Sequence, residues 1–193
     1  MNIQDWGELI ETLMGAYDQN MKYDDRDVFA LTDTCRGALL ADIYRKTGSV
    51  PSGDYIRTYT VPVTKGTGGL SLIQLPVTIA NGPDNLGIRA ITNTVYPYVN
   101  WNIIRSGTAA QYRPADLGGR AAAWLEGQTI KAVNTAAMEV LLSVIPSLSD
   151  PSMDQFSEIL GDSELEGKLL DMVMQRLMIK KQTPKLGAND GRV

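Results

Sequence analysis

Apolar residues near the start of the chain recur every three or four positions, which is the spacing of an amphipathic helix. One apolar stripe predicts a helix over residues 3–18 with Asn2 as its N-cap, and a second predicts a helix over residues 25–47. Gly48 and Pro51 end the second helix, because neither residue continues a helix readily. A short polar turn separates the two helices, so they are predicted to form a helical hairpin.

The pattern then changes to β-branched and aromatic residues that are interrupted by Gly, Pro and Asn, which is typical of strands and turns. A Glu126-Gly127 pair separates two short β runs and predicts a hairpin turn, and the nearby glycines argue against a long helix there. The predicted strands are residues 54–63, 70–79, 87–98, 99–106 and 138–146, with the hairpin over residues 121–133.

The end of the chain returns to helical spacing. Residues 164–181 are predicted to form a helix capped by Asp162 or Ser163, after a turn-rich passage over residues 146–164 with room for one short helix. The apolar face of this last helix is wide, and such helices are usually buried on more than one flank. One flank is therefore predicted to face its own core and the other a second subunit. The flank assigned to the second subunit consists of Leu170, Met174, Leu177 and Met178.

The order helix–helix, sheet, helix predicts an α+β fold with helices gathered on one side of an antiparallel sheet. A single α+β domain is expected over residues 1–193. It comprises a helical hairpin at 1–50, a β-rich region at 54–146, a terminal helix at 163–181 and an extended tail at 182–193.

Composition narrows the classes of function. Hydrophobic residues make up 44% and charged residues 21%, which is typical of a soluble globular protein. The net charge of −4 has no basic block, which argues against nucleic acid as a direct ligand. The absence of histidine removes the commonest general base and the commonest zinc ligand. The single cysteine, Cys35, excludes an internal disulfide and is predicted to be a small buried hydrophobe.

Neither a secretory signal nor a membrane span is predicted. The opening stretch MNIQDWGELI is polar and acidic, and it lacks the charged start and apolar run of a signal peptide. No apolar run approaches the roughly 20 residues that cross a bilayer. We therefore expect a soluble protein that is made in a reducing compartment.

Two motifs resemble ligand-binding loops without matching them. The run KGTGGL at 65–70 lacks the Lys-Ser/Thr of a phosphate-binding loop and lies between predicted strands, so a hairpin turn is favoured. Residues 150–161 resemble a calcium loop, but Gln155 stands where glycine is needed and Gly161 where a bidentate glutamate is needed. A cluster of capping side chains is the better interpretation of this stretch. Its polar members are Asp150, Ser152, Asp154 and Glu158.

Asp24, Asp25 and Asp27 crowd three carboxylates together and could in principle hold magnesium. At a predicted helix start they instead favour the positive end of the helix dipole, and capping is the preferred interpretation. The sequence thus assigns no metal-binding residue, and no metal or other cofactor is expected.

An aromatic group follows at Tyr96, Tyr98 and Trp101, with Arg105 nearby. Such a group can stack on bases or sugars. Because it lacks basic surroundings, sheet packing or a protein interface is favoured. No catalytic or cofactor-binding residue is assigned. We predict a structural protein that binds other proteins and forms an assembly, rather than an enzyme.

The C-terminal part of the chain carries a family resemblance. The runs AWLEGQTIKAV, MEVLLSVIPSLSD and VMQRLMIKKQTPKLGANDGRV, in this order after a helical hairpin and a β-rich middle, carry it. The chain resembles the small adaptor or ring proteins at the head-to-tail connection of tailed bacteriophages. The likeness is greatest to those of short-tailed phages, including crAss-like phages of gut bacteria. It covers the C-terminal part best and the middle loosely.

The resemblance implies a virion structural protein that is assembled in the host cytoplasm. Copies of the chain would form a ring, a dodecamer, beneath the portal protein and extend the channel through which DNA leaves the capsid. The implied partners are other copies, the portal and other tail or ring proteins, with DNA only as channel cargo and no membrane. Such proteins have no active site, and the C-terminal helix and tail face the portal or the adjoining subunit.

Two other functions stay open from the sequence. One is a phage-encoded, carboxylate-dependent hydrolase acting on a sugar polymer, which would need two acidic residues facing one cleft. The sequence singles out no such pair. The other is a tail-completion adaptor that lies outside the connector.

Overall fold

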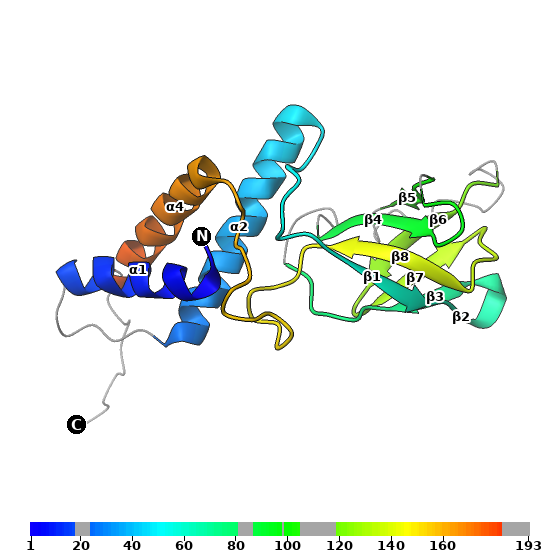
Figure 1. Ribbon diagram of the computed structural model, residues 1–193, viewed down its shortest axis with the longest axis horizontal. Coiled ribbons are helices and arrows are strands. Elements are labelled where there is room, and N and C mark those ends of the chain that lie inside the picture. The colour runs from blue at the N-terminus through cyan, green and yellow to red at the C-terminus, as the bar shows by residue number, and fades with distance from the viewer. Residues whose placement is uncertain (18–23, 81–86, 98, 105–118, 183–193) are drawn as a thin grey trace, which may run out of the picture.

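Three α-helices lie at one end of an elongated molecule and the β-strands at the other, within the part of the chain that the computed structural model describes (Figure 1). The predicted α+β class is confirmed. The helices gather at one end of the β region, however, and do not cover the face of a sheet (Figure 1). The described residues are 1–17, 24–80, 87–97, 99–104 and 119–182.

The helices begin and end close to their predicted positions, because their caps are those that the sequence indicates. Asp24 accepts a hydrogen bond from the Arg26 backbone N–H at 3.0 Å and so begins the second helix. Gly48 ends it with φ 72°, a conformation that favours glycine, and donates its N–H to the Tyr44 carbonyl at 2.8 Å. Asp162 caps the last helix. The helices are α1 (Ile3–Tyr17), α2 (Asp25–Thr47) and α4 (Ser163–Gln182).

The passage before α4 consists of turns, and the short helix for which it has room is absent. The Asp150 carboxylate accepts a hydrogen bond from the Ser152 N–H at 2.8 Å, and Asp154 accepts one from the Phe156 N–H at 3.1 Å. Side chains that satisfy backbone donors two residues ahead compete with helix formation. The same bonds confirm the capping interpretation of this acidic stretch.

Within the described ranges, eight strands form two sheets with the orders β1-β8-β4 and β2-β3-β7-β6-β5. All neighbours are antiparallel except β5 and β6. The predicted 121–133 hairpin is confirmed, with Gly127 at φ 62° in its turn. The strands are β1 (Arg57–Pro62), β2 (Thr64–Lys65), β3 (Ser71–Gln74), β4 (Ile88–Asn93), β5 (Asn102–Ile103), β6 (Ala122–Glu126), β7 (Thr129–Val133) and β8 (Glu139–Val144).

The chain joins the two sheets at both of their sides, which gives a flattened barrel. On one side β1 runs through Val63 directly into β2, and the Val63 N–H donates to the Met138 carbonyl at 2.7 Å. On the other side the Trp101 N–H donates to the Ile91 carbonyl of β4 at 2.8 Å, one residue before β5 begins. The continuous strand at one corner and the backbone pairing at the other remove much of the open edge that favours aggregation.

The helical end and the barrel each have a hydrophobic core of their own. In the barrel, the inward-facing side chains of both sheets form the core, including Ile73, Ile91 and Leu142. At the helical end the three helices pack around Trp6 and Leu40, together with the connecting segments on either side of the strands. Two cores imply that something besides apolar packing sets how the two ends are joined.

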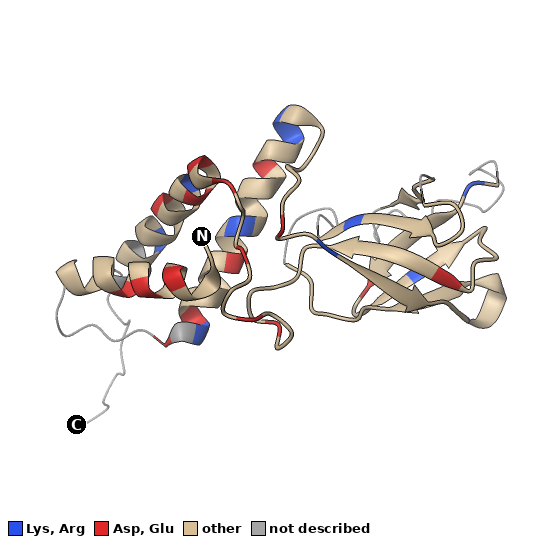
Figure 2. Ribbon diagram, in the orientation of Figure 1, with Lys and Arg blue, Asp and Glu red and all other residues tan. Residues whose placement is uncertain are grey.

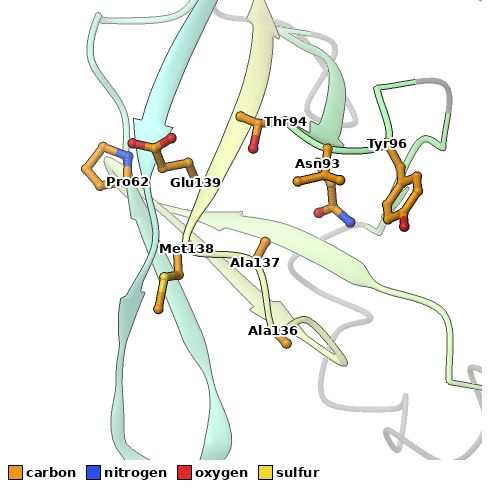
Figure 3. Close-up of a pocket in the computed structure, with 9 residues that line it drawn as sticks. Pro62, Asn93, Thr94, Tyr96, Ala136, Ala137, Met138 and Glu139 are labelled. Atoms are coloured by element: carbon orange, nitrogen blue, oxygen red, sulfur yellow. The ribbon is translucent and has the colours of Figure 1, made fainter.

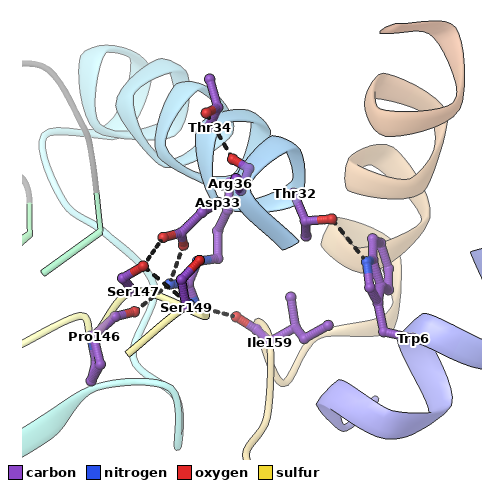
Figure 4. Close-up of polar contacts among 10 residues, drawn as sticks. Trp6, Thr32, Asp33, Thr34, Arg36, Pro146, Ser147, Ser149 and Ile159 are labelled. Atoms are coloured by element: carbon purple, nitrogen blue, oxygen red, sulfur yellow. Dashed lines mark hydrogen bonds and ion pairs between the residues drawn. The ribbon is translucent and has the colours of Figure 1, made fainter. Parts of the chain in front are cut away.

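A buried ion pair lies where the helical end meets the chain leaving β8 (Figure 4). The fully buried Arg36 guanidinium of α2 donates to Asp33 Oδ1 at 2.7 Å and to the Ile159 carbonyl at 3.3 Å, and it also contacts the Pro146 carbonyl. Ser147 donates its hydroxyl to Asp33 Oδ2 at 2.5 Å. These bonds tie α2 to both ends of the segment between β8 and α4.

Most of the wide apolar face of α4 is covered by its own domain, with Met178 half-buried, which corrects the expectation of an open flank. Leu177 is only 2% exposed and belongs to the helical core, and Leu170 and Met174 pack against that core. The reason is that α4 packs against α2, and that residues of the connecting segments join the same core.

Candidate functional site

The end of the barrel farthest from the helices exposes large apolar side chains, which the rest of the described chain mostly buries. Two loops carry them: the β4–β5 loop and the β7–β8 loop. Folded proteins leave few such groups clustered in water, and a cluster usually marks an interaction site. The exposed side chains and their exposed fractions are Val95 (72%), Tyr96 (56%), Val99 (55%) and Met138 (84%).

An open depression of about 710 Å³ lies between these loops, and we call it the distal depression (Figure 3). Its walls come from the end of β1, the end of β4 with the residues after it, and the β7–β8 loop with the start of β8 (Figure 3). Most of the lining side chains are apolar. The lining residues are Pro62, Asn93, Thr94, Val95, Tyr96, Ala136, Ala137, Met138 and Glu139.

Backbone and side-chain hydrogen bonds hold the β7–β8 loop in place. The Met138 carbonyl accepts from Val63, the Thr135 carbonyl accepts from the Lys65 ammonium at 3.1 Å, and the Thr135 hydroxyl accepts from the Ala137 N–H at 3.1 Å. The loop backbone is therefore fixed while the Met138 side chain remains in solvent. A preformed apolar surface of this kind needs little ordering when a partner binds.

The depression offers little for acid–base chemistry. Glu139 is the one carboxylate among its described lining residues. The buried acids of the described chain have structural partners elsewhere: Asp33 pairs with Arg36, Asp150 accepts from Thr78 and Ser152, and Glu166 contacts the Met1 amino group. Within the described ranges, three or more Cys, Asp or Glu side chains nowhere gather as a metal site would require.

Trp101 and Tyr96, two of the aromatic residues that the sequence singles out, lie in different places in the structure. Trp101 is 5% exposed in the barrel core, and its indole N–H donates to Asn93 Oδ1 at 3.2 Å. Sheet packing is thus confirmed for Trp101, which cannot stack on a base. Tyr96 lies in the distal depression. Tyr98 and Arg105 lie outside the described residues.

The other candidate motifs take the structural roles that the sequence favours. KGTGGL forms the turn between the antiparallel strands β2 and β3, with Gly68 and Gly69 at positive φ. Asp24 caps α2. Cys35 is fully buried, as expected, and its burial raises the pKa of the thiol, although Arg176 opposes the shift.

The distal depression itself was not predictable from periodicity. Val95, Val99 and Met138 lie in loops, where apolar residues contribute no repeating stripe. One signal was present: large apolar side chains stand among the turn residues of TNTVYPYVN and NTAAME, where loops are normally polar.

Comparison with known proteins adds no family: no family model matches this chain, and no curated protein matches it significantly. None of the helices in the described part of the chain combines the length and apolarity that a bilayer crossing demands.

Proposed function

We propose that the chain is a virion structural protein, one subunit of a head–tail connector ring that lies beneath the portal and extends the DNA exit channel. The exposed apolar surface around the distal depression is the observation that supports a role in assembly. A preformed, mostly apolar surface at the tip of a rigid barrel suits contact with another protein. The choice of a connector among assemblies comes from the resemblance of the C-terminal sequence.

The charge distribution is compatible with DNA as cargo. α1 carries Asp5, Glu8 and Glu11 and has no lysine or arginine, and acidic side chains gather on the helical end (Figure 2). Retention of DNA depends on cationic side chains that displace counterions from phosphates. In the proposed ring, an acidic surface facing the channel would repel the phosphates, so that DNA could pass it without being held.

A carboxylate-dependent hydrolase finds no comparable support. Hydrolysis of a glycosidic bond needs two carboxyl groups on opposite sides of one cleft. Glu139 has no second carboxylate beside it among the described residues that line the distal depression. We therefore favour assembly over catalysis.

Locating the chain in particles tests the proposal. Purified virions labelled with an antibody against the folded chain should show the label at the junction of head and tail by electron microscopy, and co-purification with the portal protein should follow. Label confined to the capsid shell or the distal tail, or absence of the chain from particles, would overturn the connector assignment.

A further inference from the structure

The last turn of α2 forms a projection with the chemistry of a binding surface. Its residues 44–47, which we call the α2 tip, are all exposed and extend past the other two helices (Figure 1). Tyr44 is 43% exposed. Lys46 pairs with Asp42 at 2.6 Å, whereas the Arg45 guanidinium forms no ion pair with any described residue. The tip thus presents an aromatic ring beside a cation that forms no ion pair within the described chain, although the hydrogen bond from Lys46 and the charge of Arg45 together lower the pKa of the Asp42 carboxyl.

The α2 tip and the distal depression are complementary in shape and charge. The tip is convex and cationic, while the depression is concave, mostly apolar and carries the single carboxylate of Glu139. Tyrosine and arginine are the residue types that most often dominate binding energy at interfaces. Val95 and Met138 supply the apolar walls against which a tyrosine ring can pack.

We propose that the α2 tip of one copy docks into the distal depression of a second copy, with Tyr44 against Val95 and Met138 and with Arg45 facing Glu139. This inference rests on the proposed function, because it names the partner of the surface on which that function depends. The two contacting surfaces differ, so each bound copy keeps one free tip and one free depression. Head-to-tail contacts of this type generate rings when the rotation closes.

Charge favours this contact over two alternatives, a contact through Phe156 and a symmetric contact between two distal depressions. Phe156 is also exposed, at 68%, but Asp154 and Glu158 flank it and would repel Glu139. A symmetric contact of two distal depressions would place one Glu139 near the other. Like charges brought together at an interface lower affinity.

A mixing experiment tests the head-to-tail arrangement. The tip variant Tyr44→Ala/Arg45→Glu keeps its depression, and the depression variant Val95→Glu/Met138→Glu keeps its tip. Each variant alone should sediment as a monomer at concentrations where the natural chain associates, with at least roughly 30-fold weaker self-association. A one-to-one mixture should form dimers and nothing larger, since one intact interface remains per pair.

Several results would overturn the proposal. These are a mixture that stays monomeric, a tip variant that associates like the natural chain, or a natural chain that remains a monomer at its solubility limit. Loss of association in Phe156→Ala with the tip variant unaffected would assign the contact to Phe156 instead. Circular dichroism and thermal midpoints equal to those of the natural chain show that the variants, all at exposed positions, remain folded.

Charge exchange tests the Arg45–Glu139 pairing. Arg45→Glu and Glu139→Arg should each weaken association by about fivefold, as expected for an exposed ion pair. Both changes in one chain should restore the association of the natural chain, and failure to restore it would overturn the pairing. These measurements use the purified chain, so a failed self-contact is distinguishable from a failed location at the head–tail junction of particles.

Discussion

Arg36 is the most deeply buried charged residue in the described part of the chain. A fully buried guanidinium is tolerated only because Asp33 and backbone carbonyls surround it, and even so its Nε has no hydrogen-bond partner among the described residues. Burial lowers the pKa of Arg36, and the Asp33 carboxylate opposes that shift. The pair is thus more important for fixing one arrangement than for net stability.

We expect Arg36→Met to lower the free energy of unfolding by about 3–5 kcal/mol, because it leaves the Asp33 carboxylate buried without its cation. Arg26→Met, at an exposed position of the same helix, should change it by less than about 0.5 kcal/mol. Urea denaturation measures both. The double variant Asp33→Leu/Arg36→Met should recover much of the loss, and equal stability of the natural and Arg36→Met chains would contradict the prediction.

The Asp150 carboxylate makes a pH-dependent contribution to the free energy of unfolding. Burial alone would raise the pKa of this carboxyl, but hydrogen bonds from Ser152 and Thr78 outweigh it, so the pKa is lowered on folding. A lowered pKa stabilises the fold above the ordinary aspartate pKa, and this contribution is lost as the pH falls through the folded-state value. Asp150→Asn should therefore destabilise the chain by about 1–3 kcal/mol at neutral pH.

The difference in unfolding free energy between the natural chain and Asp150→Asn should shrink below about pH 4. Urea denaturation between neutral and acidic pH measures it. Asp154→Asn, at an exposed position of the same turn, is the control and should show a smaller change across this range. A pH-independent difference for Asp150→Asn would mean that the carboxylate charge is unimportant there.

At the scale of elements, helices were more predictable than strands. The caps Asp24 and Gly48 are local signals, so the ends of α2 could be predicted from neighbours in sequence. The predicted strand at 70–79 is a strand only as far as Gln74, because its partner β7 ends its pairing there. Pairing of that kind involves residues far apart in the chain, which local alternation does not encode.

The prediction of an open flank on α4 was wrong for the same reason, because contacts between distant parts of the chain decide which flank is covered. Periodicity correctly placed its wide apolar face, but it could not indicate that one chain supplies enough surface to cover it. Leu177→Ala should lower the free energy of unfolding by about 2–5 kcal/mol, since that side chain is 2% exposed in the helical core. Met178→Ala, one position along and only partly buried, should cost clearly less in thermal or urea denaturation. Equal costs would mean that Met178 is covered as well as Leu177.

For the whole molecule, the arrangement of two cores raises the question of whether they unfold together. The sequence predicts a single domain, whereas apolar packing alone would allow the helical end and the barrel to melt separately. The Arg36 pair holds the segment that leaves β8 against α2, and the connecting segments run between the two ends. Rigid coupling would also be useful in a ring subunit, since the proposed contact places the helical end of one copy against the barrel of the next.

Two tryptophans report on the two ends independently. Trp6 is fully buried in the helical core and Trp101 is 5% exposed in the barrel. Variants that retain only one of these tryptophans, the others replaced by phenylalanine, should give coincident urea transitions if the natural chain unfolds as one unit. We expect coincidence, because the Arg36 bonds must break before either end can separate.

The same pair of variants carrying Arg36→Met provides the decisive comparison. Removing the guanidinium leaves the two cores intact but weakens the link between them, so the Trp6 transition should move to lower urea than the Trp101 transition. Arg26→Met in the same backgrounds should leave the transitions coincident. If the transitions stay coincident in Arg36→Met as well, the covalent segments between the helices and the barrel suffice for coupling, and the buried ion pair does not control how the two ends are joined.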